Sequence, residues 1–85
     1  MAYGSDFVAQ LEAASVKAVG RIVAGSILQN HLRKFNKSKD ELTPEDCRSL
    51  AQNTSSSIAL FVSNEEGERF RYALRRLLEQ NYLAS

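Results

Sequence analysis

The sequence has almost no net charge, only one cysteine and only one proline. The first two shortages argue against a disulfide-stabilised protein and against a generally basic nucleic-acid-binding protein. A single cysteine, Cys47, cannot form a disulfide within the chain, so the fold must depend on packing and a reducing cytoplasm is the expected compartment. A formal net charge of +1, from 11 basic and 10 acidic side chains, provides no general attraction for nucleic acid or for an anionic membrane. Only local clusters of charge can therefore bind such partners.

The sequence also lacks a long apolar run. A membrane-spanning helix needs roughly 18 consecutive apolar residues, and Lys17 and Arg21 interrupt the most apolar stretch. Asp6 and Glu12 likewise interrupt the basic-then-apolar layout of a secretory signal peptide. We therefore expect a cytoplasmic protein without a membrane partner. It should fold as one domain over residues 1–85, because the chain is too short for two.

The spacing of the apolar residues is typical of an all-α protein, with three helices over about 5–35, 44–62 and 64–82. The segment 5–35 contains no proline, so we expect one continuous helix there. Between residues 13 and 28 it carries only two charges, Lys17 and Arg21, which share one helical face because they are four residues apart. Asn36 can end this helix in the left-handed conformation.

Clear start signals precede the second and third helices. Thr43 is followed by the single proline and can cap the second helix, while Asp46 lies near the positive end of the helix dipole. The apolar face of the second helix continues at helical spacing as far as Phe61. Ser63 and Glu66 have the capping-box spacing at the start of the third helix.

The predicted helices differ in length, and this difference dominates the structural prediction. At 1.5 Å per residue, the first helix would be ~45 Å long and the other two ~28 Å each. Short connections favour an up-down-up bundle in which the start of the first helix extends beyond its neighbours. This overhang would expose an apolar stripe of a kind that monomeric proteins seldom tolerate. Its residues are Phe7, Val8, Leu11 and Ala14.

Two arrangements would cover this stripe. In the favoured one, two chains pair their long helices as a helical homodimer, and the interface contains Phe7, Val8, Leu11, Ala14 and Ala18. In the other, the first helix breaks near Gly20 or Gly25 and the chain folds into a compact four-helix unit. Glycine permits such a break, but the segment has no proline or polar loop that requires one.

The sequence gives little basis for an enzyme or a metal site. The only histidine, His31, and the only thiol, Cys47, flank the first loop and could approach each other. Cys47 lies on the apolar face of its helix, however, where cysteine is commonly a small buried hydrophobe. One histidine and one cysteine are also too few for a structural zinc site in one chain. We therefore expect no catalytic residues, no metal and no cofactor.

Basic residues near the end of the first helix and along the third helix suggest an alternative partner. In the predicted bundle these two regions are neighbours, so a combined patch could contact the phosphates of a nucleic acid. The candidate contacts are Arg33, Lys34, Lys37, Arg75 and Arg76. The favoured interpretation is a solvated surface on which nearby carboxylates pair with these side chains.

The sequence thus favours a small, non-catalytic interaction or regulatory accessory protein. It would self-associate, or dock on another helical protein, through its long first helix. The alternative is a small nucleic-acid-binding regulator that uses the basic patch. Salt distinguishes the two hypotheses, because binding to phosphates weakens steeply with salt whereas apolar helix association responds little.

Overall fold

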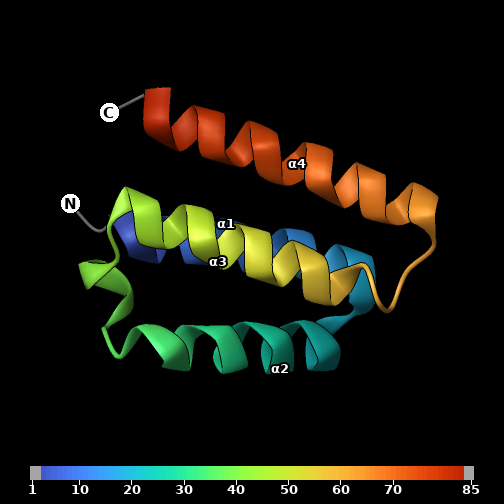
Figure 1. Cartoon of the computed structure of the whole chain (residues 1–85), viewed down its shortest axis with the longest axis horizontal. Coiled ribbons are helices and arrows are strands. Elements are labelled where there is room, and N and C mark those ends of the chain that lie inside the picture. Colours follow the sequence, from blue (N-terminus) through green and yellow to red (C-terminus); the bar gives the residue numbers. More distant parts are fainter. Residues whose placement is uncertain (1–2, 84–85) are drawn as a thin grey trace.

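The computed structural model describes residues 3–83, which form four α-helices and two short 3-10 helices with no strand in that range (Figure 1). The all-α class predicted from the sequence is therefore confirmed. The unit measures 35 × 26 × 17 Å along its principal axes. In chain order the elements are α1 (Tyr3–Val19), α2 (Arg21–Leu32), η1 (Arg33–Phe35), η2 (Lys39–Glu41), α3 (Pro44–Ile58) and α4 (Asn64–Leu83).

The predicted continuous helix over 5–35 is wrong, because the chain turns at Gly20. This residue has φ 90° and ψ 165°, a backbone conformation that is essentially restricted to glycine. Its N–H donates to the carbonyl of Val16 at 2.8 Å, and its carbonyl accepts from Ala24 at 3.0 Å. Both backbone polar groups of Gly20 are therefore hydrogen-bonded although the helix ends. Gly25 lies within α2, so of the two predicted break points only Gly20 is used.

Because α2 folds back beside α1, the first helix is short enough for the other helices of the same chain to bury its apolar residues. With 17 residues α1 is ~26 Å long, close to the ~22 Å of α3 and ~30 Å of α4. Phe7 and Leu11 are 0% exposed within the single chain, and Val8 is also buried. The predicted overhang is therefore wrong, since the neighbouring helices of the same chain cover the start of α1. The rest of the core comes mainly from α3 and α4, with Leu50, Ala51, Ile58, Phe70, Leu74 and Leu77.

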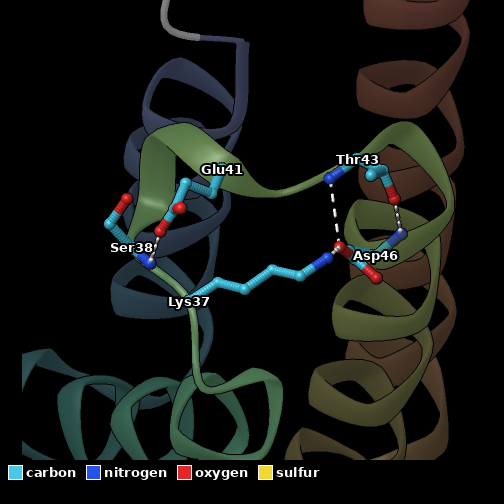
Figure 2. Close-up of polar contacts among 5 residues, drawn as sticks. All are labelled: Lys37, Ser38, Glu41, Thr43 and Asp46. Atoms are coloured by element: carbon cyan, nitrogen blue, oxygen red, sulfur yellow. Dashed lines mark hydrogen bonds and ion pairs between the residues drawn. The ribbon is translucent and has the colours of Figure 1, made fainter.

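The connection between α2 and α3 is held by two local hydrogen-bonded motifs (Figure 2). Asp46 donates its backbone N–H to Thr43 Oγ1 and accepts the Thr43 N–H on Oδ2, both at 3.1 Å, so the predicted start of α3 is confirmed. Asp46 Oδ2 also lies 2.8 Å from Lys37 Nζ. In the preceding turn the Ser38 N–H donates to Glu41 Oε1 at 2.9 Å. These contacts fix the entry of the chain into α3.

Close packing of α1 against η2 completes this end of the bundle, which we call the capped end. A Cβ atom at Gly4 would overlap the carbonyl oxygen of Lys39 and come within 2.9 Å of Leu42 Cβ, so the backbones can meet only because Gly4 lacks a side chain. Asn36 has φ 54° and closes η1 in the predicted left-handed conformation. The capped end thus comprises the start of α1, residues 33–43 and the start of α3.

The opposite end, which we call the open end, contains the α1–α2 junction and the turn between α3 and α4 (Figure 1). The prediction that the second helix reaches residue 62 is wrong, because α3 ends at Ile58 and a turn follows. Phe61, predicted on its apolar face, is 62% exposed, and Leu60 beside it is 85% exposed. Ile22, in the first turn of α2, is 87% exposed. Large apolar side chains therefore face solvent at this end.

Candidate interaction surface

A groove of about 660 Å³ lies between α3 and α4, and we call it the α3–α4 groove. Its apolar floor contains Ala51, which is 1% exposed, Leu74, which is 4% exposed, and the half-buried Leu78. Polar side chains from α3 line one wall, namely Gln52, Ser55 and Ser56. The volume is within the range of ~300–1,000 Å³ that is usual for sites that bind small ligands or a few partner side chains.

Arginine side chains surround this apolar floor. Arg48 comes from α3, and Arg71 and Arg75 come from successive turns of α4; all three are exposed. Glu79 is the single carboxylate among the lining residues, so the groove is net positive. Within the described residues, neither Arg71 nor Arg75 forms an ion pair, and the Arg75–Glu79 spacing is not used for one. A ligand with apolar and acidic groups would complement this surface.

The residues predicted to contact nucleic acid are divided between different parts of the surface. Arg33 and Lys34 lie on η1, and Lys37 is paired with Asp46. Arg75 lines the α3–α4 groove, whereas the adjacent Arg76 is exposed and does not line it. Figure 1 places α2 and its connection on one side of α1 and α3, with α4 on the other side. The expected single patch therefore does not form, because the chain turns at Gly20 and carries α2 away from α4.

The residues predicted for a dimer interface lie against the core of the chain. Phe7, Val8 and Leu11 are buried, while Ala14 and Ala18 are half-buried and pack against the hydrophobic core. The homodimer itself stays a prediction, but the reason given for it, an uncovered stripe on the first helix, no longer applies. Any contact surface must instead use the side chains that the fold leaves exposed.

His31 pairs with a serine rather than with the cysteine considered from the sequence. His31 Nε2 lies 2.9 Å from Ser57 Oγ, and its buried Nδ1 has no hydrogen-bond partner among the described residues. Burial, and secondarily the positive charge of Lys34, lower the pKa of His31. A Ser–His pair needs a third group to orient the imidazole, and no such group contacts Nδ1 in the described part of the chain. The pair therefore ties α2 to α3.

Cys47 is fully buried in the core. Burial raises the pKa of its thiol to about 11, with a smaller contribution from the neighbouring Asp46 carboxylate. A thiol with this pKa is protonated near neutral pH, and the thiolate is the nucleophilic form. Within residues 3–83, no three His, Cys, Asp or Glu side chains come together where they could hold a metal ion.

Comparisons with known proteins do not indicate a function, so the proposed function is based on the geometry of the structure. No protein-family model, curated protein or solved structure matches the chain. None of the helices in the described range combines the length and the apolar character needed to cross a membrane.

Arg48 and Arg71 line the groove but were not among the contacts predicted from the sequence. Arg71 and Arg75 are four residues apart and flank Leu74, a spacing that places them along one edge of the apolar face of α4. From that spacing, the α4 side of the groove could have been predicted from the sequence. The other half comes from α3, and only the packing of the two helices shows which α3 residues it contains.

Proposed function

We propose that this protein is a small, non-catalytic interaction protein that binds an acidic, apolar segment of a protein in the α3–α4 groove. The observation that carries the proposal is the combination of an apolar floor with arginines at its edges. Apolar anchors supply the affinity of helix-in-groove binding, and complementary charge selects the partner and speeds the encounter. The function expected from the sequence is kept, but the contact surface moves from the first helix to α3 and α4.

The alternative function, binding of nucleic acid, has weaker support. A nucleic-acid surface is dominated by contacts to phosphates and needs several cations on one face. The five residues predicted to contact phosphates lie on different elements, with Arg33 and Lys34 on η1 and the two arginines at 75 and 76 on α4, and Lys37 is already paired with Asp46. The buried apolar floor of the groove has no counterpart in a phosphate backbone.

The proposal can be tested with a designed amphipathic helical peptide that carries leucine and phenylalanine anchors on one face and glutamates beside them. We expect it to perturb the backbone NMR signals of Ala51, Leu74 and Leu78, which form the groove floor. A peptide with lysines in place of the glutamates should bind at least tenfold more weakly, because it would meet Arg71 and Arg75 with like charge.

Adjacent arginines provide a matched pair of variants. Arg75→Glu should weaken binding of the acidic peptide, whereas Arg76→Glu makes the same change of charge outside the groove and should leave binding nearly unchanged. If both variants lose the same amount of affinity for the peptide, binding depends only on the overall charge of the protein and not on the groove. If the peptide does not bind, but an oligonucleotide binds with steep salt dependence and is weakened by both variants, the nucleic-acid alternative replaces this proposal.

A further inference from the structure

The chain itself carries a segment with the chemistry that the α3–α4 groove requires. Leu60 and Phe61, in the turn after α3, are 85% and 62% exposed. Glu65 and Glu66 follow in the first turn of α4 and are also exposed, and Glu65 forms a solvent-exposed ion pair with Arg69 at 3.4 Å. We call Leu60, Phe61, Glu65 and Glu66 the acidic turn. Two large apolar side chains beside two carboxylates match an apolar floor beside arginines, in both polarity and charge.

The backbone of the acidic turn is held in place before any partner binds. The Leu60 N–H donates to the Ser57 carbonyl at 3.2 Å, and the Phe61 N–H donates to the Ile58 carbonyl at 2.9 Å. At the start of α4, the Glu66 N–H donates to Ser63 Oγ at 3.3 Å. A segment whose backbone is already ordered loses less conformational entropy on binding than a free peptide. The backbone positions from which the exposed side chains extend are therefore defined.

The acidic turn does not occupy the groove of its own chain. The turn joins the ends of α3 and α4, the two helices that form the groove. The groove is lined by residues of α3 between positions 48 and 56 and of α4 between positions 71 and 79, and by no residue of the turn. The high exposure of Leu60 and Phe61 agrees with this placement. An acidic turn can therefore enter the groove only from a second molecule.

We propose that the α3–α4 groove of one molecule binds the acidic turn of a second copy of this chain, an inference that rests on the proposed function of the groove. Leu60 and Phe61 would contact the floor at Leu74 and Leu78, while Glu65 and Glu66 would approach Arg71 and Arg75. The two surfaces differ, so each molecule offers one of each. Repetition of the contact gives a ring or an open chain of copies, and two reciprocal contacts give a two-fold dimer.

Two variants test the contact by complementation. The turn variant, Leu60→Ser/Phe61→Ser, keeps an intact groove, and the groove variant, Arg71→Glu/Arg75→Glu, keeps an intact acidic turn. All four positions are exposed, so both variants should retain the helical circular dichroism spectrum of the wild type. Sedimentation of the wild type over a dilution series should show self-association. Each variant alone should associate at least about tenfold more weakly, the loss expected when anchor residues are removed.

Mixing the two variants is the decisive measurement. The turn variant supplies a groove and the groove variant supplies a turn, so the mixture should form a one-to-one complex at concentrations where neither variant alone associates. Ile22→Ser is the matched control, because Ile22 is 87% exposed at the same end but follows Arg21 rather than preceding acids. This control should associate like the wild type.

The outcomes separate the two proposals. A wild type that stays monomeric while the designed acidic peptide binds the groove would overturn the second-copy proposal and leave the proposed function standing. Failure of both the peptide and self-association would overturn both. If the turn variant loses association but the mixture does not restore it, the turn pairs with another surface and the groove assignment is wrong.

Discussion

The two ends of the bundle are built differently. At the capped end, Thr43 and Asp46 exchange hydrogen bonds, Lys37 pairs with Asp46, and the backbone at Gly4 meets η2. At the open end, the α3–α4 turn has one side-chain cap and leaves Leu60 and Phe61 in solvent. A small chain has few interactions with which to hold a fold, so this distribution indicates that the capped end is built for stability. The open end leaves large apolar side chains exposed, and our proposal assigns two of them, Leu60 and Phe61, to binding.

The strongest test of this contrast compares two phenylalanines. Phe7, in the second turn of α1, is 0% exposed, whereas Phe61 in the open turn is 62% exposed. Phe7→Ala should lower the free energy of unfolding by about 3–5 kcal/mol, because it removes buried surface and leaves a cavity. Phe61→Ala should change it by less than ~0.5 kcal/mol in dilute solution. Urea unfolding measures both, and comparable losses would contradict the division into a stabilising end and a binding end.

Two glycines test the junction at the open end. Gly20→Ala should lower the free energy of unfolding by about 1–3 kcal/mol, because alanine does not readily adopt φ 90°. Gly25→Ala should raise it by up to about 1 kcal/mol, since a Cβ there meets no atom within 4 Å and alanine favours the helix. In thermal unfolding, the melting temperature should fall for Gly20→Ala and rise for Gly25→Ala. A Gly20→Ala protein that is both stabilised and more elongated in small-angle scattering would show that the break is optional.

The caps of α3 and α4 should differ in strength. Thr43→Ala removes the acceptor of a 3.1 Å bond in a reciprocal motif and should cost about 1 kcal/mol of unfolding free energy. Ser63→Ala removes a single bond of 3.3 Å and should cost less, since that bond is longer than the usual 2.9–3.0 Å. Hydrogen exchange should show greater opening of the first turn of α3 in the first variant. Equal effects of the two substitutions would mean that the two starts are capped equally.

The smallest expected effect is a dependence on pH at the capped end. The hydrogen bond from Lys37, with the backbone bond from Thr43, lowers the pKa of Asp46, and the backbone bond from Ser38 lowers that of Glu41. A carboxylate whose folded pKa lies below its unfolded pKa stabilises the fold fully above the unfolded value and loses this contribution as the pH falls through the folded value. Stability should therefore decline below about pH 4.

Lys37→Ala provides the corresponding check by carbon NMR titration. Because Lys37 makes the largest contribution at Asp46, its removal should raise the pKa of that carboxyl toward its ordinary value of 3.8. The pKa of Glu41 should move much less, since its main hydrogen bond comes from Ser38. An unchanged Asp46 would mean that the Lys37 contact is absent in solution.

Local signals in the sequence were sufficient where neighbouring residues decide the structure. Thr43 and Asp46 predicted the start of α3 because a cap depends on residues three positions apart. Ser63 predicted the start of α4, and Asn36 the left-handed residue that closes η1, for the same reason. The burial of Cys47 also followed from its place in the apolar repeat of α3.

Other features depended on contacts between distant segments. The apolar spacing continues through Gly20 and through Phe61, so periodicity predicted helix where the chain turns. Phe7 is buried and Phe61 is exposed because neighbouring helices cover only the first. The spacing of apolar residues predicts burial for both phenylalanines. Arg71 and Arg75 could be assigned to one edge of a helix, but their meeting with α3 could not be predicted.

Interactions within a few residues specify the all-α class, the caps and the starts of α3 and α4, so these features could be predicted from the sequence. Contacts between distant segments specify the turn at Gly20, the burial of Phe7 within its own chain, and the basic, apolar groove between α3 and α4. Glycine permits a helix as well as a turn. The choice depends on the apolar surface that α1 and α2 bury by folding back beside each other and against α3 and α4.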